Sequence, residues 1–138
     1  MRALLFIVVF FLLNSCSNNP ESFIKHLNGY WEIENVTLPD GNKRSYSFNE
    51  TIDYIKITDS LTGFRKKLKP NFNGSFETSN NAEHFSFTKV NDSLHIYYET
   101  PFAKWKETIL FVNESQLKVI NQNKAVFLYK RFTPFNLE

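Results

Sequence analysis

The residues of this chain that could carry out chemistry are few and widely spaced. None of its three histidines stands at the spacing of a metal-ligating motif. No glycine-X-serine-X-glycine sequence, which positions the nucleophile in many hydrolases, occurs. We therefore expect a protein that is not an enzyme and that uses no metal or cofactor. The carboxylates that interrupt its alternating segments are not paired by any sequence pattern: Asp53, Asp59, Glu99 and Glu107.

The only cysteine, Cys16, is the one residue with a distinctive chemical setting. It follows Arg2 and an unbroken apolar run, ALLFIVVFFLL, at 3–13. This run is too short for a transmembrane helix, which needs about 20 residues. It has the length of the apolar core of a secretory signal peptide. A lone cysteine in an exported chain has no disulfide partner and is seldom left as a free thiol.

The residues LNSC at 13–16 resemble the lipobox of bacterial lipoproteins: an aliphatic residue, two small residues and a cysteine. The resemblance implies that residues 1–15 are removed as a signal peptide. Cys16 would then carry a thioether-linked diacylglycerol and an acylated amine. Several acyl chains anchor a protein stably, whereas a single chain binds membranes only marginally. The alternative is an ordinary signal peptide with a chance cysteine.

The residues after Cys16 bear on where such a lipoprotein would reside. Ser17 follows the cysteine, and in the sorting rule of enteric bacteria this favours the outer membrane. Residues 17–22 contain no acidic cluster of the kind used for export to the cell surface. We therefore expect a lipid-anchored protein of the cell envelope, at the outer membrane and facing the periplasm. Residues 16–22 would form the lipidated tether and residues 23–138 a single domain.

The charge balance excludes one class of partner. The chain has 16 basic and 14 acidic residues. Arg2 is the only charged residue that removal of the signal peptide would take away. Domains that bind nucleic acid carry a strong basic surface, so we expect no nucleic-acid partner. The sequence identifies no protein partner. Aromatic residues make up 17% of the chain, which is sufficient apolar material for a core in a small domain.

Residues 20–29 predict a short helix, because Pro20 suits a first helical position and Gly29 suits a helix end. After this helix, apolar and polar residues alternate with period two, which is typical of strands. Asn, Asp, Gly and Pro separate the alternating segments. The predicted strands are 30–37, 43–48, 51–58, 63–69, 73–79, 83–90, 93–99, 103–112, 115–121 and 124–132.

The connections between these strands are short. At 39–42, for example, PDGN predicts a turn, because proline presets φ and glycine accepts positive φ. Strands joined in this way predict an antiparallel up-and-down meander of about eight to ten strands. A meander of this size must close or protect its edges. We therefore expect an all-β domain preceded by a short helix.

The residues GYW at 29–31, between the predicted helix and the first strand, resemble the G-x-W signature of lipocalins. The order of elements is similar to that of the small lipocalin-like (calycin-type) lipoproteins of bacteria. The resemblance implies a closed β-barrel in which Trp31 plugs one end. It also implies that a basic residue on the last strand stacks over Trp31, and Arg131 is favoured over Lys130 because its guanidinium is planar. The structural residues of the barrel base would be Gly29, Trp31 and Arg131.

The barrel interior has two open interpretations. An eight-stranded barrel has room for packed side chains or for one small ligand. A hollow barrel lined by apolar side chains would hold an apolar molecule such as a fatty acyl chain, whereas a filled one would be a simple core. The side chains expected to point inward are Ile33, Ile55, Ile57, Phe64, Phe85, Phe87, Leu94, Ile96, Ile109 and Phe111.

The basic run RKKLK at 65–69 also has two interpretations. It could form a positive rim that attracts a carboxylate or an anionic lipid. It could instead be a solvated strand face on which lysine discourages aggregation. Alternation places Lys66 on the same face as Phe64 and Leu68. We favour the solvated face.

Two functions therefore remain. The first is a lipid-anchored, lipocalin-like module that binds a small hydrophobic or amphipathic molecule. The second is a non-enzymatic interaction protein of the envelope, with a filled barrel and a binding face on its surface. A cavity that opens at the end opposite Trp31 would distinguish the first from the second.

Overall fold

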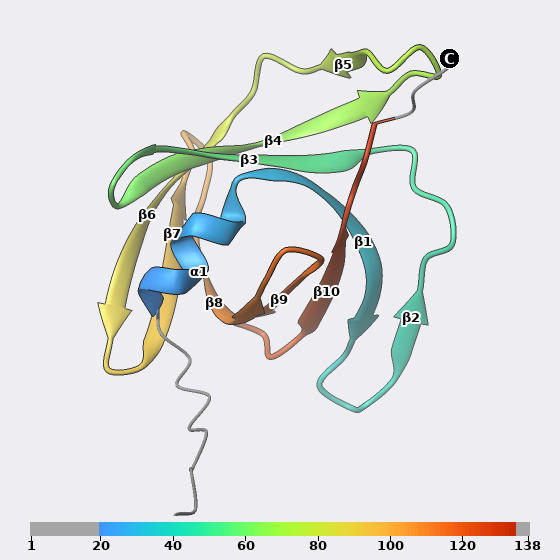
Figure 1. The fold of residues 1–138 in the computed structure, drawn as a ribbon. Coiled ribbons are helices and arrows are strands. Elements are labelled where there is room, and N and C mark those ends of the chain that lie inside the picture. The colour runs from blue at the N-terminus through green and yellow to red at the C-terminus, as the bar shows by residue number, and fades with distance from the viewer. Residues whose placement is uncertain (1–19, 135–138) are drawn as a thin grey trace, which may run out of the picture.

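The computed structural model describes residues 20–134, which form one short helix and a strongly curved sheet (Figure 1). The predicted signal peptide and Cys16 lie outside the described residues. The helix begins at Pro20, so its first turn includes residues 20–22 of the expected tether. The elements are α1 (Pro20–Leu27), β1 (Gly29–Thr37), β2 (Lys43–Ser45), β3 (Ile52–Asp59), β4 (Thr62–Pro70), β5 (Phe76–Thr78), β6 (Glu83–Val90), β7 (Ser93–Glu99), β8 (Lys104–Val112), β9 (Gln116–Asn121) and β10 (Val126–Arg131).

Eight of these strands close into an antiparallel barrel. They pair in the order β1-β3-β4-β6-β7-β8-β9-β10, and β10 returns to β1. Closure leaves the ring without free edges. The two remaining strands lie outside it, with β2 on β1 and β5 on β4. The structure therefore confirms the predicted all-β barrel with its short N-terminal helix. The helix is not long and apolar enough to span a membrane, and the described residues contain no other helix.

The two strands outside the ring are shorter than the alternation predicts. At 73–79 the expected strand is reduced to Phe76–Thr78, because Asn73 and Gly74 form a turn. The backbone N–H of Ser75 donates to Asn73 Oδ1 at 3.0 Å, and Gly74 has a φ of +83°. At 43–48 the strand ends at Ser45, and residues 46–51 cross to β3 as an irregular segment.

Two β-bulges decide which side chains point inward. One lies in β1 between Ile33 and Asn35, and the other in β8 between Ile109 and Phe111. A bulge adds one residue to its strand and inverts the alternation beyond it. In β8 it turns Val112 into the core and leaves Phe111 37% exposed. The prediction that Phe111 lines the interior was therefore wrong.

Phe64 is the second predicted interior residue that the structure places elsewhere. Its ring lies edge-on to the rings of Tyr54 and His84, with centroids 6.2 and 6.3 Å apart. Its neighbour in β4, Arg65, points into the barrel instead. The prediction failed because the inward residue is charged, so hydrophobic alternation assigns β4 the opposite phase.

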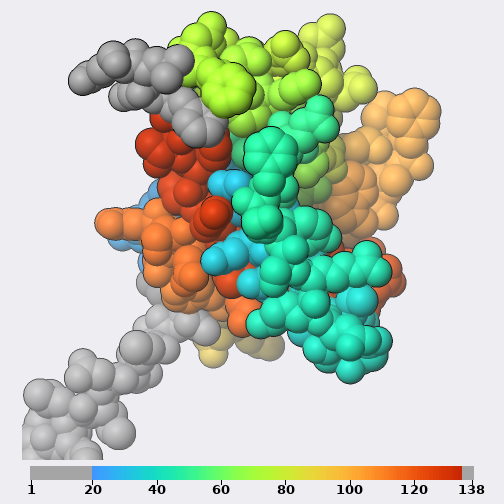
Figure 2. All heavy atoms as spheres, turned by 90° about the vertical axis from the view of Figure 1, so that its right-hand side faces the viewer, coloured from blue at the N-terminus to red at the C-terminus, as the bar shows by residue number. Residues whose placement is uncertain are grey.

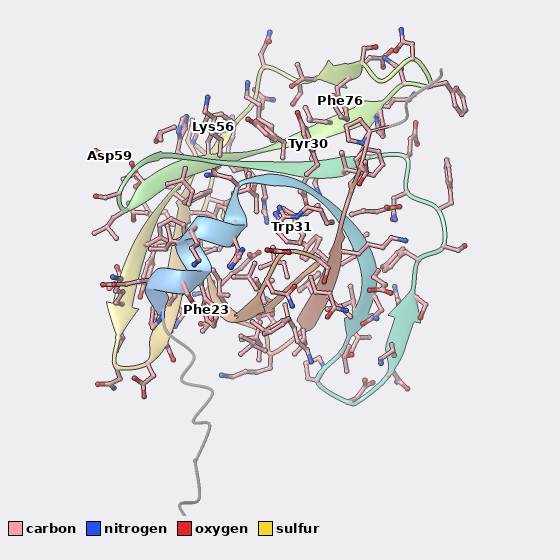
Figure 3. All side chains as sticks on the ribbon, in the orientation of Figure 1. Phe23, Tyr30, Trp31, Lys56, Asp59 and Phe76 are labelled. Carbon is pink, nitrogen blue, oxygen red and sulfur yellow. The ribbon has the colours of Figure 1, made fainter. Side chains whose placement is uncertain are left out.

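An aromatic row covers the outer face of β1, β3 and β4. Tyr30 stacks on Tyr54 at 5.0 Å and on Phe76 of β5 at 4.9 Å. Figure 3 shows Tyr30 and Phe76 next to each other beside β3 and β4. These contacts hold β5 against the barrel, and Leu68 is buried on the strand that pairs with it.

The base of the barrel is built around Trp31, which has no exposed surface. Its indole Nε1 donates to the Leu27 carbonyl at 2.9 Å, and the Arg131 guanidinium lies 3.7 Å from the centre of its ring. Arg131 also donates to the carbonyls of Asn28 (2.8 Å) and Glu114 (3.0 Å). One side chain thus joins the end of α1, the start of β1 and the β8–β9 turn. The alternative residue, Lys130, instead lies 3.9 Å from Glu32.

Gly29 opens β1 where the Arg131 side chain passes closest to the backbone. Helix α1 ends at Leu27, and Gly29, two residues later, is the first residue of β1. Its φ is +129°, and a Cβ there would lie 2.7 Å from Arg131 Nη1. The glycine of the GYW sequence therefore leaves room for the guanidinium that covers the tryptophan.

Substitution of Gly29 tests this arrangement. We expect Gly29→Ala to lower the free energy of unfolding by about 1–3 kcal/mol, because it adds backbone strain and displaces the guanidinium. Gly41→Ala is the control, since Gly41 also has a positive φ but a Cβ there would meet nothing within 4 Å. Chemical denaturation would measure both variants. An equal loss of stability in the two would contradict the proposed contact with Arg131.

Candidate functional site

The barrel wall has a gap on one side. β3 begins only at Ile52, and it pairs with β1 no further along β1 than the Trp31–Asp53 pair. Beyond that pair, residues 46–51 cross the gap as an irregular segment. Behind the segment lies a hollow of about 410 Å³, which we call the mouth hollow. Its volume lies within the range of small-molecule sites, about 300–1,000 Å³.

The walls of the mouth hollow combine apolar and polar side chains, and the apolar ones come mainly from β1 and β10. Ile33 and Val36 of β1 face Phe127 and Tyr129 of β10 across the closing pair of the barrel. Val36 points inward because the β1 bulge inverts the alternation after Ile33. Trp31 borders the floor, but it has no exposed surface and therefore closes the hollow.

A few polar contacts hold the crossing segment in place. The Asn49 side-chain amide donates to the Ile33 carbonyl at 3.0 Å and to Glu32 at 3.2 Å. On the other side, Glu50 pairs with Lys69 of β4 at 3.2 Å. Phe48, in the same segment, is 85% exposed. Figure 2 faces this side, and the teal residues of the segment lie across the surface in front of the blue atoms of β1.

Two charged residues form the polar part of the floor. Asp53 of β3 and Lys67 of β4 are direct partners across the strands, and both line the mouth hollow. Lys67 Nζ lies 2.5 Å from Asp53 Oδ1. The two groups form an ion pair, and Asp53 Oδ1 itself is buried. The Asp53 side chain is 4% exposed and that of Lys67 is 57% exposed.

A second charged group lies deeper in the barrel, around Arg65. Its Nη2 donates to Glu83 at 3.0 Å, and its Nη1 lies 3.6 Å from Glu107. The guanidinium lies 4.4 Å from the centre of the Tyr98 ring. Arg65, Tyr98 and Glu107 border a cavity of about 10 Å³, which is room for about one water molecule. The enclosed part of the interior is therefore filled.

Burial sets the ionisation of this inner group. Burial raises the pKa of Glu107, and the Arg65 charge opposes that rise only in part. Burial would lower the pKa of Arg65, but Tyr98 and Glu107 outweigh it and hold that pKa well above its ordinary value. Arg65 is thus a permanent buried cation, and Glu107 is the partner whose charge depends on pH.

A second, larger hollow lies outside the barrel. Its volume is about 650 Å³, and it follows β6, β7 and β8 as far as Gln122. Phe85 and Tyr98 are buried in the barrel. Because side chains alternate along a strand, their neighbours Ser86 and Tyr97, which line this hollow, lie on the outer face of the barrel. This hollow is separate from the mouth hollow, because the two share no lining residue.

Most of the predicted interior residues form a packed core. Ile33 is the one that lines the mouth hollow, and Ile57 packs against the core cluster from its edge. The described residues contain no cluster of three or more metal-ligating side chains. The predicted interior residues that are buried in the core cluster are Ile55, Phe85, Phe87, Leu94, Ile96 and Ile109.

Sequence reasoning missed the polar residues of the site. The alternation that turns Ile55 and Ile57 inward also turns Asp53 inward, so a signal for Asp53 was present. Arg65 and Lys67 of the basic run both lie on the inward face of β4, whereas Lys66 lies on the other face. The position of Val36 depends on a bulge, which the sequence does not mark.

The pH dependence of stability tests the state of Glu107. Because its folded pKa is raised above the ordinary value of 4.5, wild-type stability should fall as pH rises from that value through the raised pKa. Glu107→Gln cannot ionise, so its stability relative to wild type should rise over the same window. Urea denaturation at a series of pH values would measure the difference. A trend of opposite sign would show that Arg65 lowers this pKa below its ordinary value.

This chain is similar to known lipocalin-like proteins. A family model described as a lipocalin-like domain matches residues 27–119. A solved structure of a lipocalin-like protein from Bacteroides uniformis is similar to this chain with a TM-score of 0.49 and 10% sequence identity, covering 78% of this chain and 99% of that one. No curated protein matches. Because the family model covers more than half of the 138 residues, this chain belongs to the lipocalin-like domain family.

Proposed function

We propose that this protein is a lipid-anchored binding barrel of the bacterial envelope that takes a small hydrophobic or amphipathic molecule into the mouth hollow. The observation that carries the proposal is the hollow itself, about 410 Å³ behind a gap in the barrel wall. Its lining combines an apolar wall from β1 and β10 with polar groups such as Asp53 and Lys67, which suits an amphipathic molecule. The lipocalin-like family supports a binding barrel in general terms.

The route into the hollow supports a binding role. The segment 46–51 is tied to β1 by the Asn49 side chain and by the backbone N–H of Tyr46, which donates to the Glu34 carbonyl at 2.9 Å, and to β4 by Glu50. Exposed ion pairs such as Glu50–Lys69 contribute little stability, typically about 0–1 kcal/mol. The segment is therefore held mainly on β1, and the hollow opens most easily on the β4 side.

A second function has its own observation. The enclosed interior is filled, and the hollow on the outer face of β6, β7 and β8 is larger than the mouth hollow. Phe102, on the loop that joins β7 to β8, is almost completely exposed. Exposed apolar groups of this kind often mark interaction sites. An interaction protein of the envelope that uses this outer face is thus the alternative.

Filling the mouth hollow tests the first function. We expect Val36→Phe to weaken binding of the neutral fluorescent probe N-phenyl-1-naphthylamine at least tenfold, because its ring would project from β1 into the hollow. Val90→Phe is the matched control, since Val90 is exposed at the far end of β6. Fluorescence titration would measure both. Equal binding in the two variants would place the probe elsewhere and favour the outer-face function.

Metabolic labelling tests the anchor. We expect radiolabelled palmitate to enter the wild-type chain and to be absent from Cys16→Ser, because the thioether and the acylated amine both form at that residue. Ser17→Ala is the control and should keep the label. Label that persists in Cys16→Ser would show that Cys16 is not the lipidated residue.

A further inference from the structure

The chemistry of the floor defines the ligand of the mouth hollow more narrowly, on the basis of the proposed function. Asp53 lies on a strand held on both sides, by Trp31 of β1 and Lys67 of β4. Its carboxylate is therefore fixed in the wall. Lys67 reaches it with a flexible side chain that is 57% exposed. A ligand could replace the lysine at Asp53 without disturbing the barrel.

The Asp53 carboxylate already holds an ammonium group. Its Oδ1 is buried, and the Lys67 ammonium lies 2.5 Å from it. A buried carboxylate that lost this cation would be strongly destabilised. A charge-assisted hydrogen bond from another cationic N–H is among the stronger ways to replace it. Asp53 lines the mouth hollow as well as the small cavity beside Arg65, so a ligand in the hollow lies next to it.

The charges that line the hollow favour a cation over an anion. Asp53 and Glu50 are its acidic residues, and Lys67 is its basic residue. Arg65 of the same basic run does not line it and is engaged with Glu83 and Glu107. A carboxylate ligand would therefore have to lie beside two acids and compete with Asp53 for one lysine. A like charge at that distance is repelled.

We propose that the ligand is an amphipathic amine: its protonated amino group replaces Lys67 at Asp53, and its apolar body lies against the inner face of β1 and β10. Lys67 then turns into solvent. The lysine thus occupies the position of the ligand's amino group when the hollow is empty. A fatty acid, which an apolar interior alone would accommodate, is excluded by its own charge.

Three probes of equal chain length test the inference: dodecylamine, dodecanol and dodecanoate. Each would compete with N-phenyl-1-naphthylamine for the purified protein at neutral pH and at concentrations below micelle formation. We expect dodecylamine to bind at least tenfold more tightly than dodecanoate, with dodecanol between them. Equal affinity for dodecylamine and dodecanoate would overturn the inference and leave the proposed function intact. Failure of all three to compete would overturn both.

Variants of the floor assign the effect to the named residues. Asp53→Asn should weaken dodecylamine at least tenfold and leave dodecanol unchanged. Lys67→Met should strengthen dodecylamine binding, because it removes the competing ammonium, and since Lys67 is half-exposed this variant should fold. Glu50→Gln is the control for a change of charge at the exposed rim. Loss of dodecylamine binding in Lys67→Met, or an unchanged preference in Asp53→Asn, would overturn the inference.

Discussion

The architecture depends on one contact, the Arg131 guanidinium on the Trp31 ring. Arg131 and Trp31 are direct partners in the β1–β10 pair that closes the barrel. The guanidinium also binds carbonyls at the end of α1 and in the β8–β9 turn. An arginine suits this position because its planar group can stack and donate several hydrogen bonds at once. The base is therefore closed, and access to the interior is through the wall.

The interior is divided into two unlike parts. Beside β6, β7 and β8, large side chains pack into a core, and the cavity left near Arg65 holds about one water molecule. Beside β1 and β10, the late start of β3 leaves the mouth hollow, covered by residues 46–51. The barrel is thus filled in one part and hollow in the other, and the difference follows from the length of the neighbouring strands.

Membership of the lipocalin-like family accounts for the barrel, and the side chains of this chain supply its particular chemistry. Buried charges are retained only when they are paired. Arg65 meets this condition through Glu83 and Glu107. Asp53 meets it through Lys67, a lysine that reaches in from solvent. The carboxylate whose cation is exposed is therefore where the structure offers most to a ligand.

Most strands, the turns and the base of the barrel could be predicted from the sequence. These depend on local rules: period-two alternation, turn residues, and a glycine that leaves room beside Trp31. The site could not be predicted in this way, because its residues meet only in the folded chain. Asp53, Arg65 and Glu107 come from three strands, and their meeting depends on register, while one-residue bulges reversed the phase at Val36 and Phe111. A bulge arises from packing between strands distant in sequence, so no local pattern records it.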